Sequence, residues 1–260
     1  MDSAQTTRIR DEGTHRSRVY ETARYLSDGF GPRLAGSSGY MRAARWAAAE
    51  LSRFGATRAA LEPWGTRGPA WDLGHHSAEM TSPFYLRLNA LPRAWSLPLA
   101  GTLRGAPLQV ASLATATERR QWTGKLRGRI VMLGRVAPAA DVKDRFTAGA
   151  ARYTDVELDS MARITDPGAP ATYWEDFDEW EEALNEERAL LEWMVREGVS
   201  AVLEPSGNEL TLLATQYYSY ISARDVNVPT FVVAREQYRR MQLLLDRGDP
   251  VRLDLALTTH

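Results

Sequence analysis

LSDGFGPRLAGSSGYMRAARWAAAELSRFGATRAALEPW, residues Leu26–Trp64, is the stretch that decides how the first quarter of the chain folds. Ser37 or Ser38 is suited to cap a helix, because a serine hydroxyl can accept an orphan main-chain N–H of the first turn. Apolar residues then recur at spacings of three and four, at Met41, Ala44, Ala48 and Leu51. Gly55 follows Phe54 and fits a left-handed residue just after a helix. The stretch therefore predicts a polar loop, one amphipathic helix and a glycine stop.

The flanking sequence predicts one shorter helix before this stretch and a link after it. Val19, Ala23 and Leu26 lie on one helical face, and the pattern ends near Gly29. Residues 65–83 begin with a run rich in Gly, Pro and Trp, which is typical of a link between two parts of a chain.

The remainder alternates short apolar runs with two longer helical patterns. We expect strands at Phe84–Leu88, Leu97–Leu103, Leu108–Leu113, Arg129–Leu133, Val199–Leu203, Thr230–Val233 and Val251–Leu257. We expect helices from Phe177 to Val195, ended by Gly198, and over Glu236–Arg247. Residues 137–175 show no sustained periodicity and are interpreted as an insertion or long loop. The predicted fold class is α/β (α+β), with helices first and a β-rich part with peripheral helices after them.

Composition restricts the function classes. The chain has 260 residues, is 44% hydrophobic and 25% charged, and carries a net charge of −1. These values are ordinary for a globular protein and give no reason to expect nucleic acid or a membrane as a partner. There is no cysteine, which excludes disulfides, thiolate nucleophiles and thiolate metal sites. The polar start MDSAQTTRIRDEG lacks the hydrophobic centre of a secretory signal. The residues themselves assign neither a localisation nor an oligomeric state.

The N-terminal pattern resembles the zinc exopeptidases of metallopeptidase family twenty-eight, which include aminopeptidases and carboxypeptidase Q-like enzymes. The resemblance is carried by the ordered set Asp28, Gly31, Pro32, Arg33, Leu34, Gly36, Ser37, Gly55, Glu62 and Trp64. In that family these positions are scaffold and not catalytic. Relatives are often exported, so the resemblance suggests a secreted or periplasmic protein.

The second half is similar to the protease-associated (PA) domain. Its turn and strand match Gly124–Leu133, its glycine-led strand matches Gly198–Leu203, and its proline-led strand matches Val228–Val233. The two resemblances imply an N-terminal segment of a peptidase domain at 1–64, a linker at 65–83, a PA domain at 84–257 interrupted near 137–175, and the start of a catalytic core at 258–260.

The family's chemistry implies two zinc ions, held by a His-x-Asp, a bridging Asp, a Glu-Glu pair and a further acid and histidine, with one Glu as general base. The four histidines, His15, His75, His76 and His260, form no His-x-Asp. The pairs Glu181-Glu182 and Glu186-Glu187 are interpreted as a solvated helix face. His75 and His76, with Asp72 and Glu79, are interpreted as surface or linker residues, because neighbouring side chains on a strand point to opposite faces.

Two other catalytic or phosphate-binding patterns are not matched. Gly36-Ser37-Ser38-Gly39 has the wrong spacing for a nucleophile elbow, and Gly101–Gly105 is followed by no phosphate-binding Lys-Ser/Thr. We therefore assign no catalytic, metal or cofactor-binding residue, and no cofactor, to this chain.

Three hypotheses follow. In the first, the chain is the N-terminal and PA portion of a zinc-dependent exopeptidase acting on peptide substrates, with its zinc ligands elsewhere, and is inactive alone. In the second, it is a stand-alone PA-type module that binds peptides or proteins. In the third, an unrecognised active site uses the acidic helix and Tyr217, Tyr218 and Tyr220. The first predicts an uncovered apolar patch around Trp46, Leu51 and Phe54.

Overall fold

The computed structural model describes residues 3–63, 65, 69–137, 152–164, 173–215 and 227–260. The chain divides into two compact units, which are described separately. Unit 1 comprises Met1–His75 together with Thr258–His260, and unit 2 comprises His76–Leu257. The fold is mixed α/β, as the sequence predicts.

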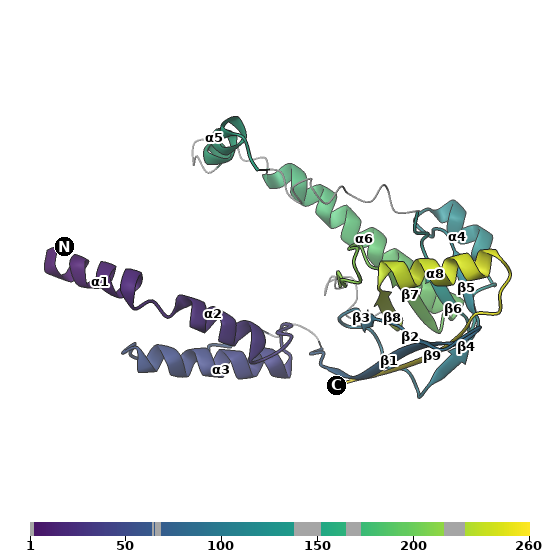
Figure 1. The fold of residues 1–260 in the computed structure, drawn as a ribbon, viewed down its shortest axis with the longest axis horizontal. Coiled ribbons are helices and arrows are strands. Elements are labelled where there is room, and N and C mark those ends of the chain that lie inside the picture. The colour runs from purple at the N-terminus through teal and green to yellow at the C-terminus, as the bar shows by residue number, and fades with distance from the viewer. Residues whose placement is uncertain (1–2, 64, 66–68, 138–151, 165–172, 216–226) are drawn as a thin grey trace. The chain divides into compact units, whose positions relative to one another are not determined.

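Unit 1 contains three helices: α1 (Ser3–His15), α2 (Val19–Asp28) and α3 (Ser38–Arg53). Ser37 is the residue that caps α3, since its Oγ accepts the N–H of Tyr40 at 3.1 Å. Gly55 adopts the left-handed conformation with φ 96°, as expected for the residue that ends the helix. Figure 1 shows α2 and α3 side by side. The rings of Tyr25, Phe30 and Trp46 join them, with the Tyr25 and Trp46 centroids 5.0 Å apart.

Sheet A has the strand order β2-β1-β9-β4. Its strands are β1 (Leu73–Ser82), β2 (Leu86–Arg87), β4 (Leu103–Gly105) and β9 (Arg252–Thr259). β1 pairs antiparallel with β2, and β4 pairs antiparallel with β9. In β9, Leu253, Leu255 and Leu257 are buried and alternate with more exposed residues. That alternation is the predicted half-buried strand.

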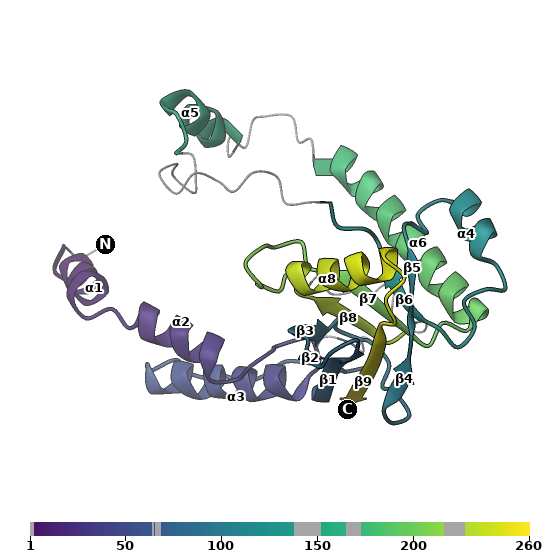
Figure 2. The same ribbon diagram turned by 45° about the vertical axis from the view of Figure 1, so that its right-hand side comes forward.

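Sheet B, with the order β3-β8-β7-β6-β5, forms the core of unit 2. Its strands are β3 (Ala90–Pro92), β5 (Pro107–Val110), β6 (Ile130–Leu133), β7 (Ala201–Pro205) and β8 (Thr230–Val233). β5 to β8 run parallel, with Val131 opposite Val202 and Val202 opposite Thr230, while β3 is antiparallel to β8. The parallel strands lie next to one another in Figure 2. Their almost continuous apolar sequences fit strands covered on both faces.

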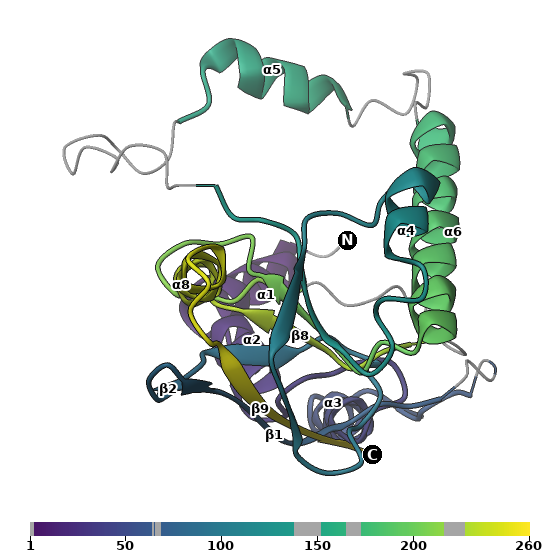
Figure 3. The same ribbon diagram turned by 90° about the vertical axis from the view of Figure 1, so that its right-hand side faces the viewer.

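Unit 2 contains four described helices: α4 (Ala116–Trp122), α5 (Asp155–Ile164), α6 (Tyr173–Glu197) and α8 (Arg235–Asp246). Figures 1 and 3 show α4 beside α6. Gly198 takes φ 73° where α6 stops, as predicted. No helix in the described part of the chain has an apolar stretch long enough to cross a bilayer.

The structure corrects three local expectations. β1 lies within residues 65–83, which the sequence predicts to be a link; its sequence LGHHSAEMTS is mostly polar, and of its residues only Ala78 and Met80 are buried. The strand expected at Leu97–Leu103 is irregular up to β4. Within 137–175, which the sequence predicts to be an insertion or long loop without sustained periodicity, α5 is helical and begins at a Thr154–Glu157 capping box.

Candidate functional site

The candidate metal ligands near the start of β1 do not form a metal site. Within the residues that the structure describes, no three His, Cys, Asp or Glu side chains gather closely enough to hold an ion. The Asp72 carboxylate instead accepts hydrogen bonds from the N–H and Oγ of Ser38, each at 2.9 Å. His75 donates its main-chain N–H to Thr258 Oγ1 at 2.8 Å. Asp72 and His75 thus serve the architecture of unit 1.

The contact between Asp72 and α3 has an electrostatic consequence. The main-chain N–H of Ser38 is the largest of the influences that lower the pKa of Asp72, and burial opposes it. An anion at a helix N-terminus is favoured both by the free N–H groups there and by the helix dipole. The Gly-Ser-Ser-Gly run therefore works as a capping structure, consistent with the scaffold role expected for it.

A hollow of about 420 Å³ in unit 1 surrounds this contact. Its apolar wall comprises Phe30, Pro32, Leu34, Trp71 and Leu73, and its polar groups are Ser38, Gly39, Arg42, Asp72 and His260. Asp72 and His260 exchange two main-chain hydrogen bonds, at 2.8 and 3.0 Å, which is the pairing of antiparallel strands. The hollow brings a carboxylate and an imidazole to one place, but the carboxylate is already bonded to α3.

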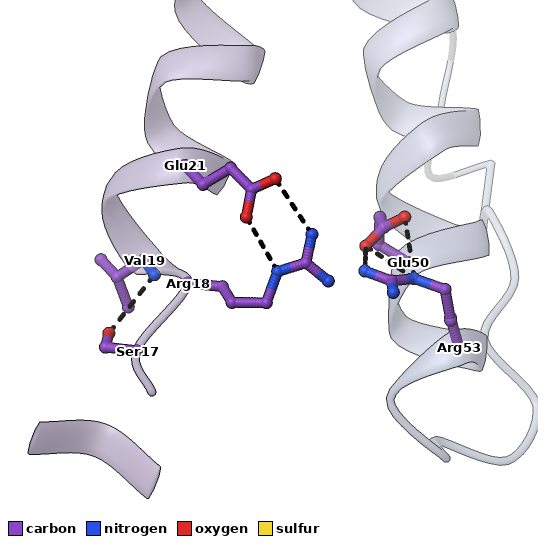
Figure 4. Close-up of polar contacts among 6 residues, drawn as sticks. All are labelled: Ser17, Arg18, Val19, Glu21, Glu50 and Arg53. Carbon is purple, nitrogen blue, oxygen red and sulfur yellow. Dashed lines mark hydrogen bonds and ion pairs between the residues drawn. The ribbon is translucent and has the colours of Figure 1, made fainter. Parts of the chain in front are cut away.

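A second group of polar side chains lies at the start of α2 and the end of α3. Figure 4 shows the Arg18 guanidinium paired with Glu21 and facing the Glu50–Arg53 pair. Arg18 Nε lies 2.9 Å from Glu21 Oε2, and this bond is the main cause of the lowered pKa of Glu21. The hydrogen bonds of the cluster lie within each pair, and of the four side chains Glu50 is half-buried at 23% exposure, so the cluster contributes little to stability.

Three of the four glutamates in the two Glu-Glu dipeptides of α6 are solvated, as predicted. Glu181, Glu182 and Glu186 are exposed, whereas Glu187 is half-buried and its carboxylate lies 3.9 Å from Arg93. Tyr217, Tyr218 and Tyr220, which the third hypothesis placed beside this helix, lie outside the described residues, as does Trp64.

Arg93 belongs to a charged hollow of about 290 Å³ beneath α6, which the sequence did not reveal. Arg93 Nη2 lies 2.7 Å from Glu204 Oε2, and each of these side chains is only 16% exposed. Burial raises the pKa of Glu204, although the Arg93 charge acts in the opposite direction. The wall comprises Ala114, Arg119, Ala183, Glu186, Glu187, Leu190, Leu191 and Met194. The signal that could have found the pair was a glutamate inside the apolar strand AVLEP.

The Arg93–Glu204 pair is best understood as a tie between sheet B and α6. A buried carboxylate with a raised pKa can take up a proton in a catalytic site, but structural ion pairs show the same shift. Here Arg93 contacts both Glu204 on β7 and Glu187 on α6, so the guanidinium links two elements. The arrangement holds a helix on a sheet.

Comparison with known proteins identifies the fold. No family model and no curated protein sequence matches the chain. Among solved structures, the chain is similar to a peptidase M28 precursor from Shewanella amazonensis, with a TM-score of 0.53 and 16% identity over 98% of this chain and 50% of that one. A zinc aminopeptidase from Bacillus subtilis gives a TM-score of 0.47 at 13% identity, over 92% and 42% of the two chains. An aminopeptidase from Aneurinibacillus sp. strain AM-1 gives 0.43 at 12% identity, over 93% and 43%.

The first of these similarities establishes a shared fold and nothing finer. At 16% identity a common architecture does not transfer an activity. The chain spans about half the length of the solved peptidase chain that it matches.

Proposed function

We propose that residues 1–260 are the N-terminal and PA-domain portion of a zinc-dependent exopeptidase, which hydrolyses peptide bonds at a chain terminus. The observation that carries the proposal is the fold shared with the Shewanella amazonensis peptidase precursor, which extends over 98% of this chain. The ordered Gly-Pro-Arg-Leu and PA-like motifs in the sequence add to it.

The described residues do not fit a zinc site. Their histidines and carboxylates form no group of three, and Asp72 is already bonded to Ser38. We therefore propose that the two zinc ions and the general base belong to a part of the protein outside these residues. No catalytic step is assigned to residues 1–260. In the proposal they serve as a scaffold for the catalytic part.

An apolar face on unit 1 supports a further part of the proposal, namely that these helices pack against a catalytic core. Leu51 and Phe54 at the end of α3 are 52% and 58% exposed, and Val19 and Tyr20 at the start of α2 are 74% and 82% exposed. Large apolar side chains exposed on two neighbouring helices fit a surface that meets another protein surface.

The coding sequence that follows codon 260 provides the first test. We expect a His-x-Asp soon after it and a Glu-Glu further on. An aminoacyl p-nitroanilide assay gives the second: the purified 1–260 chain with added Zn²⁺ should release no product, and the longer chain should release product that a chelator abolishes. Turnover by the 1–260 chain, or a following sequence without these ligands, would contradict the proposal and favour a binding module or an unrecognised site.

A matched pair of variants tests the packing face in the longer chain. Leu51→Glu places a charge on the proposed interface and should lower activity and soluble yield. Ile9→Glu changes a 69% exposed residue of α1 and should leave both unchanged. Equal effects of the two substitutions would reject the interface at α3.

A further inference from the structure

Residues 206–215, between β7 and β8, expose two leucine side chains to solvent, and part of their backbone adopts a disfavoured conformation. Leu210 is 81% exposed and Leu212 is 61% exposed. Leu210 and Thr211 have φ values of 59° and 60°, so two successive residues other than glycine are left-handed. This conformation is disfavoured for ordinary L-residues and most of all for a β-branched one such as Thr211.

Polar contacts hold this backbone in place. The Glu236 carboxylate accepts the N–H of Leu210 at 2.6 Å and that of Thr211 at 3.2 Å, the two strained positions. Asn89 Nδ2 donates to the carbonyl of Thr211 at 2.7 Å. The buried Ser206 donates its Oγ–H to the carbonyl of Leu212 at 2.7 Å and accepts the N–H of Ala214 at 2.9 Å.

Glu236 is the ionisable side chain among these hydrogen-bonding partners. Hydrogen bonds from main-chain N–H groups, its own first, lower the pKa of its carboxyl group, and the neighbouring Arg235 acts in the same direction. Asn89, which contacts the loop from the β2–β3 connection, and Gln237 of α8, which accepts a hydrogen bond from the N–H of Asn89, carry no charge, and Glu209 is the acid within the loop. Glu236 is exposed, so solvent protons reach it.

We propose that Glu236 is a latch that holds residues 206–215 in the strained conformation displaying Leu210 and Leu212, and that neutralising its carboxylate releases the loop. Apolar burial does not hold the two leucines, so the conformation depends on its polar contacts. A carboxylate provides an acceptor oxygen to each strained N–H, whereas a carboxamide has one acceptor oxygen only. Strain that persists in a native structure needs such over-determination by its surroundings.

Amide hydrogen exchange on the 1–260 chain tests the latch. In Glu236→Gln the amides of Leu210 and Thr211 should exchange about tenfold faster or more, because each loses a bond to a charged acceptor. The matched variant Glu209→Gln removes a charge from the same loop and should leave these rates unchanged. Unchanged rates in Glu236→Gln, or equal acceleration in both variants, would overturn the proposal.

A pH series on the unaltered chain decides the question even if Glu236→Gln fails to fold. The exchange rates are first corrected for intrinsic exchange. Because the pKa of Glu236 is lowered, protection at Leu210 and Thr211 should persist through about pH 4.3, where an ordinary glutamate titrates, and be lost below that pH. The amides of β7 report global unfolding in the same sample. If the loop amides lose protection at a higher pH than the β7 amides, the result supports the latch. If both lose protection at the same pH, the result refutes it.

Discussion

Asp72 connects two distant parts of unit 1 through one side chain. Its carboxylate receives both the N–H and the Oγ–H of Ser38, at the first residue of α3. Because the interaction lowers the pKa of Asp72, it stabilises the folded state above the unfolded-state value of about 3.9 and is lost as pH falls through the lower folded value.

We expect Asp72→Asn to cost about 0.3–1 kcal/mol at pH 7, the range for a negative charge near a helix N-terminus, because the carboxamide keeps one acceptor oxygen. Urea unfolding followed by circular dichroism at pH 7 and again below pH 3 measures the change. The two proteins should converge at the acidic pH. A difference that is the same at both pH values would mean that the carboxylate charge is not the cause.

The buried ion pair of Arg93 and Glu204 can be tested by removing one or both charges. Both side chains are largely buried and their charged atoms are 2.7 Å apart, so removing one partner leaves the other charge poorly compensated. Glu204→Leu should destabilise unit 2 by about 3–5 kcal/mol. The double variant R93M/E204L should recover most of that loss, because apolar side chains then fill the space. Urea unfolding curves of the two variants provide the comparison.

At the scale of elements, α3 depends on a glycine at its second residue. A Cβ added to Gly39 would lie 2.3 Å from the carbonyl oxygen of Pro32 and 3.0 Å from that of Phe30. Gly13 in α1 has no atom within 4 Å of the same position. The loop before α3 therefore passes so close to the helix that only glycine fits there.

The two glycines should respond with opposite signs to the same substitution. Gly39→Ala should destabilise unit 1 by about 1–3 kcal/mol through overpacking. Gly13→Ala should increase the helix content of α1 by an amount worth about 0.5–1 kcal/mol. Thermal unfolding measures the first and far-UV circular dichroism the second. Stabilisation by Gly39→Ala would show that the loop is free to move away.

The sequence predicts those elements whose signal is local. Thr230–Val233 is found as a strand with its predicted bounds, and Ser37 and Gly55 mark the limits of α3 as expected. β1 escaped prediction because polar residues occupy most of a strand whose place is fixed by β2 and β9. The Arg93–Glu204 contact escaped because its partners are distant in sequence and meet only through the pairing of β3, β8 and β7.

At the scale of the whole molecule, the two units differ in how much apolar surface they bury. The large fully buried side chains, among them Phe231, Met132 and Leu203, lie in unit 2. α1 and α2 contain no buried residue. Since local stability follows buried apolar contact, unit 1 should open first.

Native-state hydrogen exchange in rising urea tests this order. The amides of α2 and α3 should lose protection at a lower urea concentration than those of β6, β7 and β8. In the longer chain of the proposed peptidase, the protection of α3 should rise, because its apolar face would be covered. A single transition at all these amides would show that the units open together.

The division into units has a consequence for how such a chain changes over evolution. Unit 1 combines Met1–His75 with Thr258–His260, so the chain leaves it at His75 and returns at Thr258, two residues joined by a hydrogen bond of 2.8 Å. Unit 2 is thus a cassette whose entry and exit lie side by side. Recombination could delete, duplicate or exchange such a cassette as one piece, with a short turn closing the gap in its host.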